Sequence, residues 1–228
     1  MKPRSPAAIS KKASIFIVED HPIFRDGITQ LINKEPDMLV CGEAESAPEA
    51  LDMIKKGLPD LIIVDITLKG SCGIELTREL HKKYANIPVL VLSMHDETIF
   101  ADRVLKAGAR GYLTKQETTA TVITAIRKIL RGRLYISETM TEHFLNRYIR
   151  GDATAGESPV DSLSEREFEV FNLIGRGLTN KTIADMLCVS SKTISTYRER
   201  IKEKLNLRNN AELSRYAMFW LQNSSKPE

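Results

Sequence analysis

Five strand-like runs alternate with amphipathic stretches over the first 130 residues, and this alternation constrains the fold more than any other feature. The runs are IFIVED (15–20), MLVCGEA (38–44), LIIVDI (61–66), PVLVLS (88–93) and RGYLT (110–114). Such alternation predicts a parallel sheet covered by helices on both faces. Runs as apolar as LIIV and VLVL are typical of central strands that are buried on both sides.

The pattern stops near residue 150. The segment RGDATAGESPVDS (150–162) is rich in Gly, Ala, Ser, Asp and Pro and has no periodicity, so it is typical of a linker. After Leu163 the pattern is helical throughout. We therefore expect a disordered tail over 1–13, an α/β domain over 14–132, a helix and linker over 133–162, a small all-α domain over 163–223 and a tail over 224–228.

Composition excludes several classes of protein. The net charge of +3 gives no overall basic field, so any nucleic-acid surface must be local. Cys41, Cys72 and Cys188 are scattered without a CxxC pair, which fits a reducing compartment better than a disulfide framework. The first residues lack the apolar segment of a signal peptide, and no run approaches the ~20 apolar residues of a membrane span. We expect a soluble, cytoplasmic protein without a membrane partner.

Polar side chains stand where the predicted strands end. Glu19 and Asp20 follow the first run, Asp65 ends the third, Ser93 ends the fourth and Lys115 follows the fifth. Ligands of open parallel sheets bind outside the carboxyl ends of the strands. The sequence therefore predicts that these five residues converge in one shallow pocket.

Such a set suits phosphoryl transfer. Three neighbouring carboxylates repel one another, and a hard cation such as Mg²⁺ offsets that repulsion with oxygen ligands. An Asp can attack phosphorus and form an acyl phosphate, while a Lys and a hydroxyl stabilise the transferred phosphoryl oxygens. We expect metal-assisted phosphoryl transfer onto Asp65.

Four motifs in the first part of the chain carry a family resemblance. VED (18–20), VDITLKGSCGIEL (64–76), LSMHDE (92–97) and GARGYLTK (108–115) make residues 14–131 resemble the receiver domain of two-component response regulators. The resemblance implies a flavodoxin-like, doubly wound, five-stranded parallel sheet with strand order 2-1-3-4-5. It also implies a sensor histidine kinase as the phosphodonor.

The same resemblance assigns roles to individual residues. Asp65 is the implied phosphoacceptor, and Ser93 and Lys115 take the phosphate-sensing positions. Tyr112 falls on the switch aromatic, which is expected to turn inward when Ser93 moves toward the phosphate. The implied Mg²⁺ ligands are Glu19, Asp20, Asp65 and the backbone carbonyl of Thr67.

An alternative is an Asp-nucleophile phosphatase or phosphotransferase with an accessory helical domain. Haloacid-dehalogenase-like phosphatases place a second Asp two residues after the nucleophile, where it activates water for turnover. Here that position holds Thr67, which cannot act as an acid or base near neutral pH. The acyl phosphate should therefore persist, which favours a switch over an enzyme.

The last part of the chain predicts a helix-turn-helix. Ser164 with Glu167 forms a capping box, a short helix follows near 179–189, and a longer helix runs from about Lys192 to Leu205. At 100° per residue the longer helix has one apolar stripe, formed by Ile194, Tyr197, Ile201 and Leu205. From 192 to 208 there are six Lys or Arg against two Glu, a local net charge of +4.

A basic helix after a tight turn is the geometry that enters the major groove of DNA. Ser, Thr and Lys side chains can read base edges, Glu199 can accept from a cytosine amino group, and flanking Arg and Lys can bind phosphates. The DNA-binding candidates are Asn180, Lys181, Lys192, Thr193, Ser195, Thr196, Arg198, Glu199 and Lys202.

Motifs in this part carry a second resemblance. LSEREFEV (163–170), GLTNKTIADML (177–187), VSSKTISTYRERIKEKL (189–205) and NNAELSRYA (209–217) resemble the LuxR/NarL-type helix-turn-helix. The form STYRERIKEKL is most similar to the subgroup that includes the virulence regulator of Bordetella. The family implies double-stranded DNA and RNA polymerase as partners, and a homodimer in the phosphorylated state that uses a last helix near 210–221. Together the resemblances predict a phosphorylation-switched transcription factor that is not an enzyme.

Overall fold

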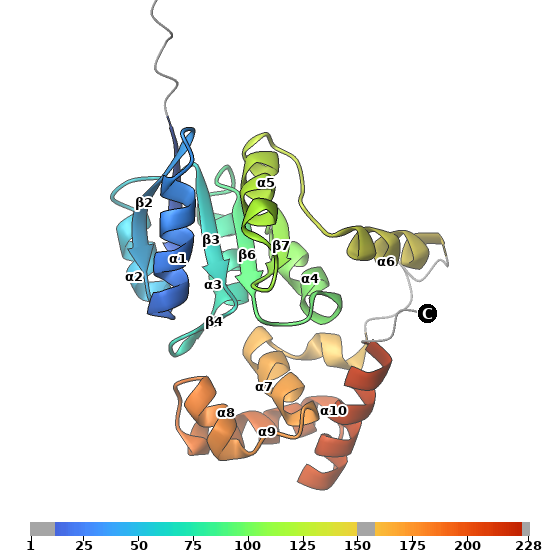
Figure 1. The fold of residues 1–228 in the computed structure, drawn as a ribbon. Helices are drawn as coiled ribbons and strands as arrows, with labels where there is room; N and C mark the ends of the chain where they lie inside the picture. The colour runs from blue at the N-terminus through green and yellow to red at the C-terminus, as the bar shows by residue number, and fades with distance from the viewer. Residues whose placement is uncertain (1–11, 150–157, 225–228) are drawn as a thin grey trace, which may run out of the picture.

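The computed structural model describes residues 12–149 and 158–224, which form an α/β region followed by a helical region (Figure 1). The strands of the α/β region are β1 (Ala13–Val18), β2 (Met38–Ala44), β3 (Leu61–Asp65), β4 (Thr67–Leu68), β5 (Ser71–Cys72), β6 (Val89–Ser93) and β7 (Gly111–Thr114). Its helices are α1 (Pro22–Asn33), α2 (Ala47–Ile54), α3 (Gly73–Lys83), α4 (Glu97–Lys106) and α5 (Thr119–Leu130). The helical region contains η2 (Pro159–Ser162), α7 (Glu165–Gly175), α8 (Asn180–Met186), α9 (Ser191–Leu205) and α10 (Asn210–Ser224).

The main sheet has five parallel strands in the order β2-β1-β3-β6-β7. This confirms the predicted order 2-1-3-4-5, because β6 and β7 are the fourth and fifth predicted strands. The antiparallel pair β4 and β5 forms a separate hairpin that follows β3 in the chain. The sequence analysis did not predict this hairpin, because strands of two residues each are too short to show periodicity. The carboxyl ends of the central strands point toward the helical region (Figure 1).

Each face of the sheet has its own apolar core. On one face, Ile15 and Ile63 pack with Ile28 of α1 and Ile126 of α5. The other face is covered by α2, α3 and α4, and its core continues without a break into the helical region. The two faces match the predicted helix cover on both sides.

Local sequence explains where the helices of the helical region begin. The Ser164 side chain accepts from the backbone N–H of Glu167, whose carboxylate accepts from the N–H of Ser164, so the predicted capping box is confirmed. The predicted stripe of α9 faces the interior, with Ile194 and Ile201 fully buried. Asn206 ends α9 in the left-handed conformation that Asn tolerates.

The described part of the connection between the regions contains the predicted helix and one short helix that the sequence did not predict. Helix α6 (Glu138–Ile149) lies beside the α/β region, and η2 occupies the end of the predicted linker. The Ser158 side chain accepts from the N–H of Val160, and Val160 itself is buried. The rest of that predicted linker, residues 150–157, lies outside the described residues, as do residues 1–11 and 225–228 of the predicted tails.

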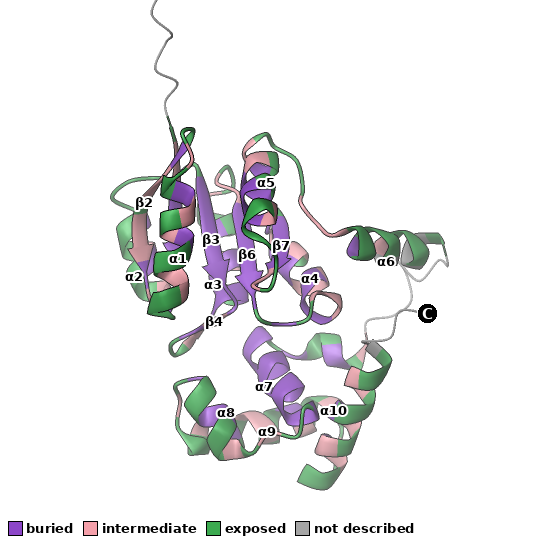
Figure 2. Ribbon diagram, in the orientation of Figure 1, coloured by how far each residue is buried: buried purple, intermediate pink, exposed green. Residues whose placement is uncertain are grey.

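Helix α7 is buried along its whole length, although most surface helices have a polar exposed face (Figure 2). It lies between the α/β region and the other helices. The ring of Phe168 is 5.2 Å from Phe100 of α4 and 5.5 Å from Trp220 of α10. No helix in the described ranges is long and apolar enough to span a membrane.

Candidate functional site: an acid rim and a helix-turn-helix face

The carboxyl ends of β1, β3, β6 and β7 bring five predicted residues to one edge of the sheet. We call this set the acid rim: Glu19, Asp20, Asp65, Ser93 and Lys115. Ligand atoms of Glu19, Asp20 and Asp65 lie within 4.8 Å of one another, together with Nδ1 of His21. The parallel register produces this convergence, because Val18 pairs with Val64 and Asp65 pairs with Leu92.

Lys115 binds two of the acids directly. Its Nζ is 2.6 Å from Oε2 of Glu19 and 2.8 Å from Oδ2 of Asp65, and its side chain is 5% exposed. The backbone N–H of Lys115 donates to the carbonyl of Ser93, which fixes the start of the side chain beside β6. The ring of Phe24 lies 4.4 Å from the ammonium and covers it from the other side.

The backbone behind Asp65 leaves no room for a side chain. A Cβ on Gly73 would overlap the carbonyl oxygen of Asp65. The N–H of Gly73 donates to Ile66 at 2.7 Å, and this closes the β4–β5 hairpin against the end of β3. Gly73 therefore fixes the loop that carries Asp65 and Thr67.

Burial raises the pKa of Asp65 above its usual range; Lys115 opposes this shift and Glu19 adds to it. A cation would favour the ionised form. The donor set fits Mg²⁺, since it offers carboxylate oxygens and a backbone carbonyl at Thr67. In addition, buried Oδ1 of Asp20 has no hydrogen-bond partner among the described residues, although His21 Nδ1 lies 2.8 Å away.

Ser93, a predicted phosphate-sensing residue, and Tyr112, the predicted switch aromatic, are connected through His95, which the sequence analysis missed. Ser93 is fully buried, and its Oγ accepts from the N–H of His95 at 3.2 Å. Tyr112 is also fully buried, and its hydroxyl donates to the carbonyl of His95 at 2.9 Å, so the ring points inward. Burial lowers the pKa of His95 to about 4. His21 was missed as well; its place directly after two acids was the available signal.

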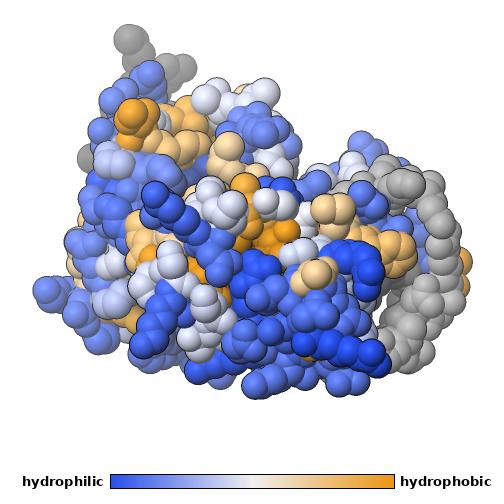
Figure 3. All heavy atoms as spheres, turned by 90° about the horizontal axis from the view of Figure 1, so that it is seen from below, coloured by the Kyte–Doolittle hydropathy of each residue, from blue (hydrophilic) through white to orange (hydrophobic). Residues whose placement is uncertain are grey.

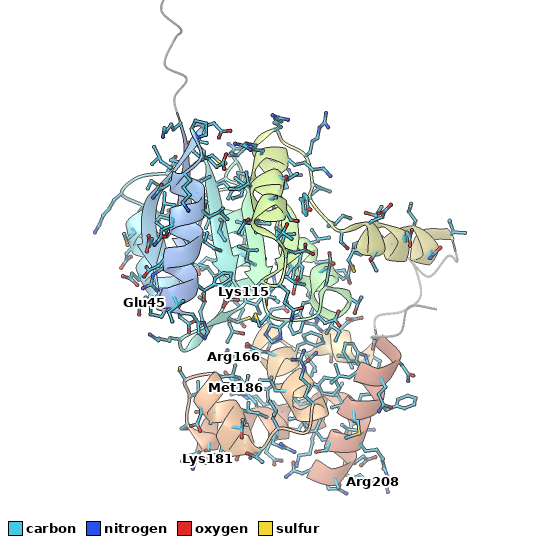
Figure 4. All side chains as sticks on the ribbon, in the orientation of Figure 1. Glu45, Lys115, Arg166, Lys181, Met186 and Arg208 are labelled. Carbon is cyan, nitrogen blue, oxygen red and sulfur yellow. The ribbon has the colours of Figure 1, made fainter. Side chains whose placement is uncertain are left out.

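The second candidate surface lies on α9, and we call it the recognition face. It consists of the exposed residues Lys192, Ser195, Thr196 and Glu199. The hydroxyls of Ser195 and Thr196 donate to backbone carbonyls of their own helix, one turn earlier. From below, the molecule presents mainly hydrophilic side chains with smaller hydrophobic areas (Figure 3). Lys181 of α8 lies at this end of the molecule, far from Lys115 (Figure 4).

Arg198 and Lys202, which were predicted to bind DNA phosphates, are less exposed than the residues of the recognition face. The Arg198 guanidinium donates to Oδ1 of Asn180 at 2.9 Å and to Oγ of Ser214 at 3.3 Å, so it joins α8, α9 and α10. The Lys202 side chain is 14% exposed and its Nζ lies 2.9 Å from Glu199. Thr193 is half-buried, and its N–H donates to Ser190, the cap of α9.

The chain is similar to known regulators along almost its whole length. Residues 15–127 match the response regulator receiver domain, and residues 161–217 match the bacterial regulatory proteins of the luxR family. The oxygen regulatory protein NreC of Staphylococcus carnosus (strain TM300) is 34% identical over 208 residues, which cover 90% of this chain and 96% of NreC. The response regulator GacA of Pseudomonas viridiflava is 35% identical over 204 residues, which cover 90% and 94% of the two chains.

A solved structure shares the fold. RcsB from Salmonella enterica serovar Typhimurium, solved bound to promoter rprA in the presence of phosphomimetic BeF3-, has a TM-score of 0.59 and 24% sequence identity. The match covers 91% of this chain and 99% of RcsB. From the two domain matches and the two long relatives, the chain belongs to the response regulators that join a receiver domain to a LuxR-type DNA-binding domain.

Proposed function

We propose that this transcription regulator is switched by Mg²⁺-dependent phosphorylation of Asp65, with a sensor histidine kinase as the donor. One observation carries the proposal: the Lys115 ammonium lies within 2.8 Å of both Asp65 and Glu19, at the strand end where Asp20 also lies. A buried cation and three acids at the ends of two neighbouring strands suit the capture of a phosphoryl group.

In the proposed reaction a carboxylate oxygen of Asp65 attacks phosphorus, and the P–N bond of the donor phosphohistidine breaks as the imidazole leaves. Lys115 pairs with a phosphoryl oxygen, and the hydroxyl of Ser93 donates to another. Glu19, Asp20, Asp65 and the carbonyl of Thr67 would hold Mg²⁺, which when bound neutralises charge on the phosphoryl group.

The proposed output is DNA binding by a homodimer. Lys192, Ser195, Thr196 and Glu199 read bases in the major groove. The phosphate contacts come from Asn180, Lys181, Thr193, Arg198 and Lys202. Helix α10 exposes Met218 and Phe219, which supports its use as the dimer contact. A two-fold dimer would read half-sites about one helical turn apart, or a multiple of one turn.

Three further assignments rest on family resemblance. RNA polymerase is the proposed partner at promoters, and the cytoplasm is the proposed location. The form STYRERIKEKL supports a relation to the Bordetella virulence regulator subgroup.

Incubation of the full chain with acetyl phosphate and Mg²⁺ tests the switch. We expect about one acyl phosphate per chain, lost in Asp65→Asn and on addition of EDTA. Continuous release of inorganic phosphate over many turnovers would instead show a phosphatase. Thr67, in the position where such phosphatases carry an acid, supports the single-turnover outcome.

A further inference from the structure

Thr67 lies next to the acceptor and also contacts the DNA-binding domain. Its backbone N–H favours the ionised form of Asp65 and so opposes the rise of that pKa that burial causes. Its hydroxyl donates to Oε1 of Glu169 on α7 at 3.0 Å. A single residue of β4 therefore joins the phosphorylation site to the first long helix of the other domain.

Glu169 is a buried acid with few partners. Its side chain is 1% exposed, and Oε2 accepts from Nη1 of Arg166 at 2.6 Å. Nη2 of Arg166 donates to the carbonyl of Leu187, at the turn between α8 and α9 (2.9 Å). Figure 4 shows Arg166 at the boundary between the domains, on the side of the helical region that faces Lys115. Hydrogen bonds thus run from Thr67, two residues after Asp65, through Glu169 and Arg166 to the helix-turn-helix.

Ser93 and Tyr112 join the same chain of contacts through His95. The Thr67 hydroxyl has one hydrogen, which it donates to Glu169, so Nε2 of His95 at 3.1 Å must be the donor to Thr67. This assigns the Nε2–H tautomer to His95, and its buried Nδ1 has no hydrogen-bond partner in the part of the chain that the structure describes. The backbone of the same His95 bonds Ser93 and Tyr112.

We propose that Glu169, a residue of the DNA-binding domain, is a positioning residue of the phosphoacceptor site. It holds Thr67 in the docked geometry, so that loading of Asp65 and docking of α7 oppose each other. The proposal rests on Asp65 being the acceptor, as argued above.

The opposition follows from charge and from hydrogen bonding. The phosphoryl group carries roughly −1.5 to −2 charge, which replaces the single charge of the Asp65 carboxylate, and it brings new acceptor oxygens beside Thr67 and Lys115. In the proposal the backbone N–H of Thr67 then donates to a phosphoryl oxygen, and the accompanying shift of this loop removes its hydroxyl from Glu169. A buried carboxylate that loses a partner is destabilised, which favours undocking of α7. By linkage, docking must weaken loading by the same factor.

Hydrogen exchange of α7 (residues 165–175) in the full chain measures this coupling. The probe is beryllium trifluoride with Mg²⁺, a mimic of the phosphoryl group. In the wild type we expect loading to speed exchange of α7 by about 5-fold or more, the lower end of typical coupling between sites. Thr67→Ser keeps the hydroxyl and should respond like the wild type.

Thr67→Val and Glu169→Gln should expose α7 to fast exchange before loading, and loading should then change it less than about 2-fold, since the typical coupling is lost. The matched control is Glu165→Gln. Glu165 lies at the same interface, where it binds Arg78 at 2.5 Å and Arg103 at 3.3 Å, but it makes no hydrogen bond to Thr67 among those of the described residues. This variant should start with faster exchange and still respond to loading.

The outcomes separate the two proposals. If the wild type does not bind beryllium trifluoride, or binds it equally well as Asp65→Asn, the proposed function fails. If the wild type binds it and Thr67→Val responds to loading as Glu165→Gln does, the positioning role of Glu169 is wrong. A loss of response in both Thr67→Val and Glu169→Gln, with Thr67→Ser intact, establishes it.

Discussion

At the acid rim, charged groups from three strand ends are buried together, whereas the charged groups of the recognition face come from one helix and are exposed. Lys115 is 5% exposed and Glu19 and Asp65 are each 3% exposed, while the side chain of Glu199 is 62% exposed. Charges at the rim interact in a low dielectric, where removal of one charged group leaves the others buried without a compensating charge. Charges on the recognition face are solvated, so each acts almost independently. The acid rim is therefore a cooperative unit, and the recognition face is a set of separate contacts.

Among the variants that test this difference between the two surfaces, Lys115→Met should lose the most stability. It leaves Glu19 and Asp65 buried without their cation, so we expect a loss of about 3 kcal/mol in the free energy of unfolding. Acyl phosphate formation should fall to background. Urea denaturation at neutral pH measures the stability.

The matched control for that variant is Lys192→Ala, which removes a cation from the exposed recognition face. Its free energy of unfolding should change by less than about 0.5 kcal/mol. Equal losses in the two variants would contradict the distinction between the surfaces.

Lys192→Ala and Thr196→Ala test the recognition face through its binding to DNA. If these side chains read base edges, each variant should lose about 1–3 kcal/mol on matched sites and less on scrambled ones. The phosphorylation of Asp65 should stay at the wild-type level. Titrations on matched and scrambled duplexes measure the difference, and identical losses on both would show that our assignment of the recognition face is wrong.

The sequence predicted the strand ends because each polar residue directly follows an apolar run, and parallel strands share one edge. The stripe on α9 was predictable for the same local reason, since its spacing is fixed at 100° per residue. The contact between the domains was not. In the sequence, Arg166 and Glu169 have the pattern of solvated charges on an amphipathic helix. Only the folded chain brings them to Thr67, which is 102 positions away from Glu169 along the sequence.

The partners of Arg198 were also not predictable from the sequence, although its position on α9 was. Periodicity places it beside the apolar stripe, where a phosphate contact is a natural hypothesis. In the structure its guanidinium bonds Asn180 and Ser214, and burial lowers its pKa. The identity of its partners depends on how three helices pack, which no local pattern encodes.

Arg198→Ala therefore tests whether one residue of α9 behaves like the buried rim. We expect a loss of about 1 kcal/mol in the free energy of unfolding, because two hydrogen bonds between helices disappear. Binding to all DNA sequences should weaken alike, as a phosphate contact predicts. Thermal unfolding and duplex titrations measure the two effects. A change in DNA affinity with unchanged stability would show that Arg198 acts only on DNA.

Lys202→Ala should have only a small effect on stability, in contrast to variants of the acid rim. Its partner Glu199 is 62% exposed, so loss of this pair should change the free energy of unfolding by less than about 1 kcal/mol. If Lys202 turns from Glu199 to a phosphate in the complex, the slope of log affinity against log salt concentration should fall by about 1. Matched and scrambled sites should weaken equally, because phosphates carry no sequence information. An unchanged slope would mean that Lys202 keeps Glu199 as its partner on DNA, and that Glu199 is then held by this ion pair and not free to read a base.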